Sequence, residues 1–285
     1  MNIQGALNEA KNYLQHSSTP ELDTELILCT VLGKDRSYLM THPEQELSPA
    51  QRHEFEDLVY QRLQGKPIAY ITHEKEFFGR SFYVDERCLI PRPETEEMVE
   101  DALNFLKKHP EHKTIIDLGT GSGNIAITMA LELTDREVYG LEISKDALEV
   151  AIRNHQKHPC NNVTFLESDL LSALPLTLHS QPLTILANLP YIGIDTNNFI
   201  SDETKAFEPD LALFGGSDGL ELYRRTWQQI KDRNLNLATL FMEIGFSQTE
   251  DMERECQKAF LEMKLEIKSD LAGLPRTAIL TKQSL

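Results

Sequence analysis

Cysteines are few in this sequence, and none of them is placed to form a metal or redox site. The 285 residues include four cysteines, which lie far apart and form neither a Cys-x-x-Cys pair nor a His/Cys cluster. We therefore expect reduced thiols and no bound metal. The four positions are Cys29, Cys88, Cys160 and Cys256.

Long apolar runs are absent as well. No stretch of apolar residues is long enough to cross a membrane. The N-terminal segment lacks the basic start and the apolar block of a signal peptide. We therefore expect a cytoplasmic protein that has no membrane partner.

Positive charge is scarce. The sequence has 28 Lys and Arg against 45 Asp and Glu, which gives a formal net charge of −17 at pH 7. Phosphate backbones repel such a chain, so the charge argues against a general nucleic-acid binder, although it does not exclude a local basic patch. A basic protein partner suits this charge. The apolar share of 40% and the length are ordinary for a globular protein of one or two domains.

The N-terminal part of the chain is predicted to be helical. Amphipathic or capped helical patterns cover residues 2–15, 20–33 and 48–65, and we expect them to form a small helical domain over residues 1–66. Residues 67–92 contain glycine, prolines and two aromatic runs, "KEFFG" and "SFYVD", which indicate a linker with a β-hairpin.

Strands and helices alternate over residues 93–285. Seven strand patterns are present, and helical patterns separate most of them, which predicts an α/β fold whose mostly parallel sheet has helices on both faces. The last two strands, "KLEIKSD" and "TAILTK", are joined by "LAGLPR" without a helix. One of the two is therefore expected to run antiparallel.

A glycine-rich loop follows the first of these strands. The strand ends at Asp117, and Gly119, Gly121 and Gly123 lead into a helix. The third glycine comes one residue too early for a dinucleotide motif, which disfavours NAD. Glu142 and Asp169 follow the ends of the next two strands, where they could accept hydrogen bonds from a ribose and from an adenine amino group.

These three strand ends favour an adenosine ligand without a pyrophosphate, such as S-adenosylmethionine. The alternative is that the glycines form only a strand-to-helix turn of an α/β protein. For Asp117 two interpretations stay open: it faces the amino group of the ligand, or it bonds the amides of its own loop.

The tetrapeptide Asn188-Leu189-Pro190-Tyr191 follows the fourth strand, at the same edge of the sheet. An amide or ring-conjugated nitrogen is a poor nucleophile, and two hydrogen-bond acceptors could orient it toward a methyl donor. Asn188 offers a side-chain oxygen and Leu189 a backbone carbonyl next to Pro190, while Tyr191 offers a ring for stacking. The alternative is an ordinary Asn-x-Pro turn. The site interpretation implies methylation of an amide or of a nucleobase amine.

Several longer stretches resemble one family closely. They are "GKPIAYITHEKEFFG", "LIPRPETEEMVE", "IDLGTGSGNIAI", "LANLPYI", "FEPDLALFGGSDGLELYRR", "MEIG" and "DLAGLPR". Together they resemble the HemK/PrmC family, the protein-(glutamine-N5) methyltransferases that act on the GGQ motif of peptide chain release factors. The resemblance implies a class I S-adenosylmethionine-dependent methyltransferase, with S-adenosylhomocysteine as product, release factors as partners and no direct nucleic-acid ligand. It also implies that the helical domain contacts the release factor.

The resemblance assigns roles to individual residues. The loop from Gly119 to Gly123 would line the methionine part of the cofactor, Glu142 the ribose and Asp169 the adenine. The tetrapeptide 188–191 would hold the glutamine amide. The full cofactor set is Asp117, Gly119, Thr120, Gly121, Ser122, Gly123, Glu142, Asp169, Leu170 and Asn188. Arg92, Pro93 and Glu94 would border the cofactor pocket or simply begin a helix, and Glu208-Pro209 with "GGSDG" would form a structural loop.

One departure from the family pattern keeps a second function open. The family usually has Asn-Pro-Pro-Tyr, whereas this chain has Leu189 at the second position, as is common in methyltransferases of ribosomal RNA adenines. An RNA adenine N6-methyltransferase is therefore the alternative. A binding protein that kept the fold without catalysis is a third reading, because a fold alone does not prove activity.

Overall fold

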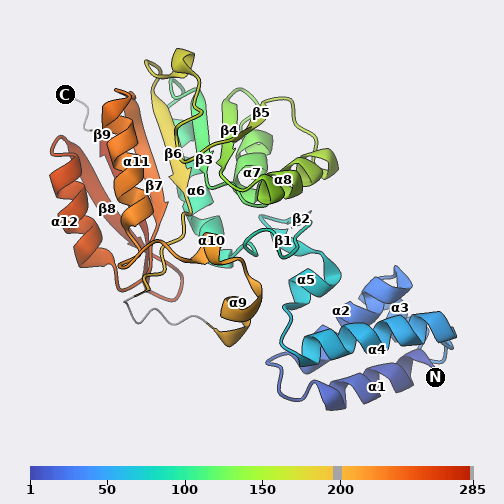
Figure 1. The fold of residues 1–285 in the computed structure, drawn as a ribbon. Helices are drawn as coiled ribbons and strands as arrows, with labels where there is room; N and C mark the ends of the chain where they lie inside the picture. The colour runs from blue at the N-terminus through green and yellow to red at the C-terminus, as the bar shows by residue number, and fades with distance from the viewer. Residues whose placement is uncertain (195–200, 283–285) are drawn as a thin grey trace. The chain divides into compact units, whose positions relative to one another are not determined.

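The computed structural model describes residues 1–194 and 201–282, and their contacts divide the chain into two compact units (Figure 1). The smaller unit comprises Met1–Glu74 together with Ser201–Phe207. The larger unit comprises Lys75–Ile200 and Glu208–Leu285. No helix among the described residues is long and apolar enough to span a membrane.

The smaller unit is helical, and local sequence signals set the ends of its helices. The Asn2 side chain accepts from the Gly5 amide at the start of α1, and Ser48 and Gln51 form a reciprocal capping box at the start of α4. Gly33 ends α2 in the left-handed conformation. The helices are α1 (Ile3–Tyr13), α2 (Pro20–Leu32), α3 (Arg36–Thr41), α4 (Pro49–Leu63), α5 (Ile68–Thr72) and α9 (Asp202–Phe207).

The apolar faces of α1, α2 and α4 pack into one core. Ile3, Ile27, Leu28 and Phe55 are almost completely buried there, as expected for amphipathic helices that would be only marginally stable alone.

The larger unit begins with a short antiparallel hairpin. Its strands are β1 (Lys75–Phe77) and β2 (Arg80–Phe82), which overlap the two aromatic runs at 75–79 and 81–85. Phe77 and Phe82 are fully buried in the same core as the apolar face of α6 (Pro93–Lys108).

A seven-stranded sheet forms the centre of the larger unit. Its strand order is β5-β4-β3-β6-β7-β9-β8, and only β9 runs antiparallel to its neighbours. The expected fold class is therefore confirmed, including the antiparallel strand of the last pair. The strands are β3 (Thr114–Leu118), β4 (Glu137–Glu142), β5 (Val163–Glu167), β6 (Leu183–Ala187), β7 (Leu237–Glu243), β8 (Met263–Ser269) and β9 (Pro275–Lys282).

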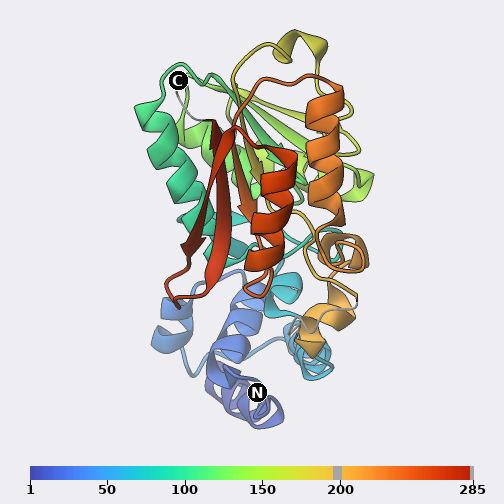
Figure 2. The ribbon, with the colours of Figure 1, turned by 90° about the vertical axis from the view of Figure 1, so that its left-hand side faces the viewer.

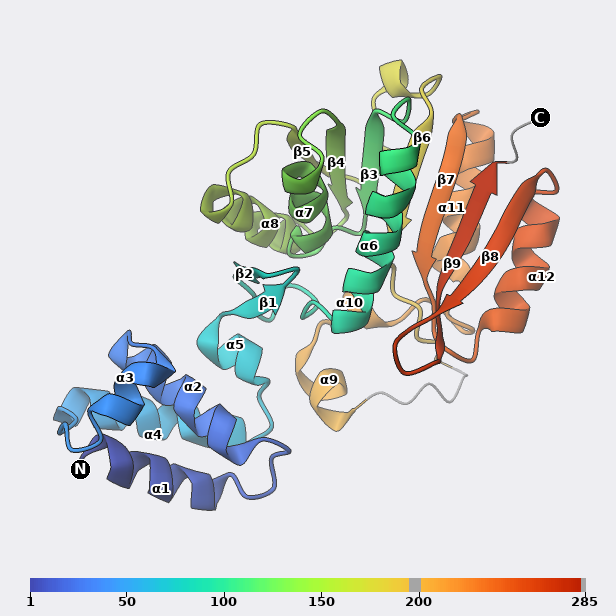
Figure 3. The ribbon, with the colours of Figure 1, turned by 180° about the vertical axis from the view of Figure 1, so that it is seen from behind.

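Helices cover both faces of this sheet. In Figure 2 the sheet lies between α6 on one side and α11 (Glu221–Asp232) with α12 (Thr249–Ala259) on the other. Figure 3 shows α6, α7 (Asn124–Glu132) and α8 (Lys145–Lys157) in front of the strands. Because both faces are covered, β3 and β6 are buried at every residue, which explains their nearly continuous apolar sequences.

The chain reverses its direction of winding at β3. The strands β4 and β5 extend the sheet on one side of β3, and β6 and β7 extend it on the other. The register pairs Leu118 of β3 with both Leu141 of β4 and Ala187 of β6. The glycine loop, Glu142 and Asn188 therefore meet at the carboxyl ends of three adjacent strands, where ligands bind in open α/β sheets.

Candidate active site

The glycine loop is built around the buried carboxylate of Asp117. The Oδ2 atom of Asp117 accepts from Thr120 Oγ1 at 2.5 Å and from the Ala126 amide at 3.0 Å. Burial raises the pKa of Asp117 to about 7, against the hydrogen bonds that favour its charged form. Of the two interpretations left open, the geometry matches the second: Asp117 bonds its own loop and the first turn of α7.

Glu142 is held at the end of β4 by backbone amides. Its Oε2 atom accepts from the Gly121 amide and its Oε1 atom from the Ser144 amide, each at 2.9 Å. The side chain is 9% exposed. Each carboxylate oxygen can accept more than one hydrogen bond, so both retain capacity for a ligand hydroxyl.

Asp169 lies beyond the end of β5 and is half exposed. Both of its carboxylate oxygens accept from Nη2 of Arg225, at 2.9 and 2.7 Å. Leu170, the next residue, has a positive φ of 52°. Arg225 was not predicted from the sequence. It lies on α11, at the end of the family-like stretch "FEPDLALFGGSDGLELYRR", from which only a structural role for Glu208-Pro209 and "GGSDG" was inferred.

The tetrapeptide Asn188–Tyr191 follows β6 and contacts three different parts of the larger unit. Asn188 Nδ2 donates to Thr95 Oγ1 at 3.1 Å, and the Tyr191 hydroxyl donates to Glu243 Oε1 at 3.2 Å. The Leu189 side chain is buried against the glycine loop, where a Cβ on Gly119 would lie only 3.1 Å from it.

Glu243 is the main buried group that the sequence interpretation did not identify. It ends β7, is 1% exposed, and also accepts from Thr95 Oγ1 at 2.6 Å. Burial raises the pKa of Glu243, while the Thr95 and Tyr191 hydroxyls and the charge of Arg276 lower it. The signal that could have found Glu243 is the same one that marked Glu142: an acid that ends an apolar, buried strand.

The segment from Glu208 to Gly219, which contains the short helix α10 (Asp210–Leu213), supports the tetrapeptide. Glu208 is buried and accepts from the Ile90 amide at 3.1 Å and from Arg92 Nη2. Ile192, just after the tetrapeptide, exchanges backbone hydrogen bonds with the loop, since its amide donates to Leu213 at 3.1 Å and its carbonyl accepts from Gly215 at 2.9 Å. These contacts match the structural role that was expected of the loop.

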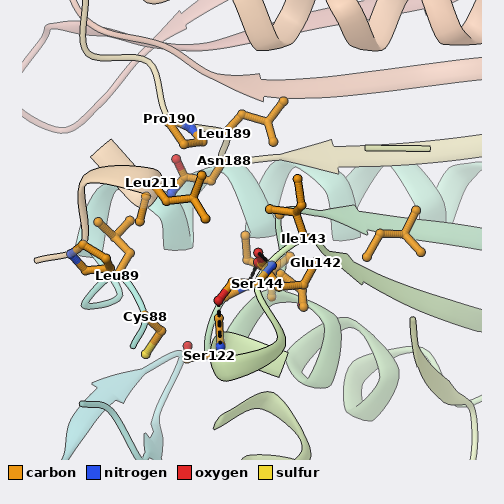
Figure 4. Close-up of a pocket in the computed structure, with 18 of the residues that line it drawn as sticks. Cys88, Leu89, Ser122, Glu142, Ile143, Ser144, Asn188, Leu189, Pro190 and Leu211 are labelled. Atoms are coloured by element: carbon orange, nitrogen blue, oxygen red, sulfur yellow. Dashed lines mark hydrogen bonds between the residues drawn. The ribbon is translucent and has the colours of Figure 1, made fainter. Parts of the chain in front are cut away.

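These elements surround one cavity in the larger unit. In Figure 4, Glu142 and Ser144 lie on one side, Asn188 to Pro190 on another, and Leu89 and Leu211 on a third. Ten of the predicted site residues line the cavity: Gly119, Thr120, Gly121, Ser122, Glu142, Asp169, Leu170, Asn188, Leu189 and Pro190.

Three predicted site residues do not line this cavity: Asp117, Gly123 and Tyr191. Arg92, Pro93 and Glu94 also lie outside its lining, which instead includes the neighbouring Arg87, Cys88, Leu89, Pro91 and Thr95.

A possible metal-ligand group lies elsewhere. Within the described residues, His109, Glu111 and His112 bring one ligand atom each within 4.8 Å of one another. They precede β3 and so lie at the opposite edge of the sheet from the cavity. His109 Nδ1 is already 3.1 Å from Glu111 Oε1, and the ring stacks on Phe105.

Comparisons with known proteins agree with this fold. A family model described as a methyltransferase domain matches residues 109–206. The solved hMettl16 catalytic domain in complex with MAT2A 3′UTR hairpin 6 has a TM-score of 0.57 at 12% identity, over 80% of this chain and 83% of that chain. Human methyltransferase 10 domain containing protein has a TM-score of 0.51 at 14% identity, over 80% and 98%. At such identities the solved structures show the fold alone, and the matching family model identifies that fold as a methyltransferase domain.

Sequence comparisons assign the chain to a narrower family. The PrmC N-terminal domain model matches residues 5–72. The release factor glutamine methyltransferase of Bacillus cereus is 37% identical over 97% of this chain and 98% of its own length. That of Aliivibrio fischeri is 36% identical over 93% and 92%. The chain belongs to the release factor glutamine methyltransferases.

Proposed function

We propose that the protein transfers the methyl group of S-adenosylmethionine to the side-chain amide nitrogen of a glutamine in a peptide chain release factor. The observation that carries this proposal is the position of Asn188. Its side chain lines the same cavity as Glu142 and the glycine loop, directly after β6, the strand next to β3. An amide-binding group and a nucleoside-binding group thus meet in one place.

The residues at the cavity fit S-adenosylmethionine. Glu142 keeps acceptor capacity for the ribose hydroxyls, and the glycine loop leaves space for the methionine part. The apolar side chains of Ile143 and Leu170 also line the cavity and suit the faces of an adenine ring. When bound, the cofactor supplies a methyl group on a positively charged sulfur.

The protein's own contribution is the orientation of the acceptor amide. The nitrogen lone pair of an amide is delocalised into its carbonyl, so it attacks poorly unless it is aimed. The Asn188 side-chain oxygen and the Leu189 carbonyl would each accept one N–H of the glutamine amide, which turns the nitrogen toward the methyl group. Such positioning lowers a barrier by up to roughly 7–11 kcal/mol.

The reaction requires the loss of one proton from the amide nitrogen as the methyl group arrives. Of the described residues that line the cavity, only Glu142 and Asp169 are acidic, and both are at its nucleoside side. The site therefore works by positioning, and the proton leaves to solvent. Tyr191 contributes by packing, because its hydroxyl is bonded to Glu243 rather than directed into the cavity.

We also propose that the helical unit recognises the release factor. It has no cofactor motif, yet α1 and α4 leave a groove between them whose edges expose Tyr13 at 57% and Tyr60 at 62%. Aromatic side chains of this kind are common in protein interfaces. A glutamine amide in a small pocket cannot by itself select one glutamine, so additional contact area must do so.

A transfer assay tests the proposed function. The protein is incubated with S-adenosylmethionine labelled in its methyl group and with purified release factor in one reaction, or with ribosomal RNA in another. We expect label in the release factor only, and none when its acceptor glutamine is replaced. Label in the RNA alone would support the adenine methyltransferase that Leu189 suggests.

A further inference from the structure

Two successive hydrogen bonds connect the side chain of Asn188 to Thr95 and then to Glu243. Asn188 Nδ2 donates to Thr95 Oγ1 at 3.1 Å, and Thr95 Oγ1 donates to Glu243 Oε2 at 2.6 Å. Thr95 lies in the first turn of α6, and Glu243 ends β7. Both Thr95 and Glu243 are 1% exposed, so water does not compete for the hydrogen bond between them.

The carboxylate of Glu243 decides which group donates and which accepts in this series of hydrogen bonds. A carboxylate can only accept hydrogen bonds, so the single hydrogen of the Thr95 hydroxyl points to Glu243. The hydroxyl oxygen is then able only to accept from Asn188. The amide of Asn188 must present its NH₂ group to Thr95, which leaves its oxygen available on the side away from Thr95.

Glu243 also fixes the other end of the tetrapeptide. Its second oxygen accepts from the Tyr191 hydroxyl at 3.2 Å. Its backbone carbonyl accepts from the Tyr223 hydroxyl, which lies 3.2 Å from the Ala187 carbonyl as well. The Glu243 carboxylate is therefore hydrogen-bonded to the Tyr191 hydroxyl and, through Thr95, to Asn188. The Tyr223 hydroxyl connects the backbone of Glu243 to the end of β6.

We propose that Thr95 and Glu243 are positioning residues for methyl transfer, which hold Asn188 with its oxygen toward the acceptor amide. This inference rests on the proposed function. If the amide of Asn188 were reversed, its NH₂ group would face the NH₂ group of the glutamine, donor against donor. The Thr95 hydroxyl prevents that reversal, because a reversed Asn188 would place its oxygen against an oxygen that has no hydrogen to offer.

The test compares two substitutions of Thr95. Thr95→Val keeps the shape and removes the hydroxyl, whereas Thr95→Ser keeps the hydroxyl. The matched control is Thr239→Val, because Thr239 lies on β7 and is buried, and its hydroxyl has no hydrogen-bond partner among the described residues. The measurements are kcat and KM on release factor, and the Kd for S-adenosylmethionine by calorimetry.

We expect Thr95→Val to lower kcat roughly tenfold, the effect of one lost hydrogen bond. The Kd for S-adenosylmethionine should stay within about twofold of the wild-type value in every variant, which also shows that the variants fold. Thr95→Ser and Thr239→Val should keep the wild-type kcat. A Thr95→Val variant with wild-type kcat, or a Thr95→Ser variant as impaired as Thr95→Val, would overturn the inference.

A double variant separates positioning from a general structural effect. If Thr95 acts through Asn188, adding Thr95→Val to Asn188→Ala should reduce the remaining activity no further. An additional tenfold loss in the double variant would contradict the inference. Wild-type protein that fails to methylate release factor would refute the proposed function instead, so the two failures are distinguishable.

Discussion

At the scale of single residues, two glutamates on neighbouring strands show how environment decides a role. Glu142 and Glu167 are register partners at the ends of β4 and β5. Glu142 is buried, lines the cavity and accepts from two backbone amides. Glu167 is half exposed, lies outside the cavity lining, and is 3.6 Å from the ammonium group of Lys145. The same residue type thus lines the cavity on one strand and is a surface charge on the next.

Substitution of these two glutamates tests the cofactor site. Glu142→Ala should weaken S-adenosylmethionine binding by about tenfold or more, because it removes charged acceptors for the ribose hydroxyls. Glu167→Ala is the control and should leave the affinity unchanged. Calorimetry on both variants measures the effect, and equal affinities would remove Glu142 from the cofactor site.

At the scale of elements, the loop around Gly215 to Gly219 positions the tetrapeptide through backbone contacts. A Cβ on Gly215 would overlap the Pro190 carbonyl, and one on Gly219 would overlap the Tyr191 carbonyl. Gln248 Nε2 connects the same two segments by donating to the Tyr191 carbonyl at 2.8 Å and to the Asp218 carbonyl at 3.0 Å. The missing side chains thus allow the loop to lie directly against the backbone of Pro190 and Tyr191.

Two glycines with the same positive φ separate backbone strain from this close packing. Gly219 and Gly273 both have a φ of 80°, but nothing lies within 4 Å of a Cβ built on Gly273. Gly273→Ala should therefore cost only the left-handed strain of about 1–2 kcal/mol, without affecting kcat. Gly219→Ala should cost more and also lower kcat, because it displaces the backbone of Tyr191. Thermal unfolding and turnover of both variants measure this, and equal behaviour would show that the loop does not position the site.

The alternation of strands and helices was sufficient to predict the sheet, including its antiparallel strand. The polar residues at or just beyond the carboxyl ends of β3, β4, β5 and β6 were predictable, because parallel strands bring these ends to one edge of the sheet. The position of the Tyr191 side chain was not predictable, because it depends on Glu243, a residue 52 positions away. The partner of Asn188 is Thr95, 93 positions away, and only packing of α6 against the sheet brings them together.

At the scale of the whole molecule, the net charge and the exposed aromatic side chains indicate which kind of partner the protein binds. The net charge of −17 opposes binding to phosphate backbones and suits a basic protein. The helical unit carries the exposed Tyr13 and Tyr60 at the groove between α1 and α4. Recognition of the release factor by one unit and of its glutamine by the other would divide selectivity between them.

Substitution of these two tyrosines tests that division. The variant Tyr13→Ser with Tyr60→Ser should raise KM for intact release factor roughly tenfold, because exposed aromatic contacts commonly dominate an interface. Its kcat and its affinity for S-adenosylmethionine should not change, since the cavity lies in the larger unit. Leu261→Ser is the control, because Leu261 is 88% exposed in the larger unit. An unchanged KM in the tyrosine variant would show that this groove does not contact the release factor.

We propose that the protein methylates a glutamine amide, which Asn188 orients in the cavity at the carboxyl ends of β3, β4 and β6. The most direct test is to map the methyl group by mass spectrometry on release factor after reaction with wild-type protein and with Asn188→Ala. We expect one methyl group on the glutamine side chain with wild-type protein. With Asn188→Ala we expect a rate lower by roughly 10²–10³-fold, at an affinity for S-adenosylmethionine within a few-fold of wild type. A methyl group on another residue, or an Asn188→Ala variant that reacts at the wild-type rate, would contradict this proposal.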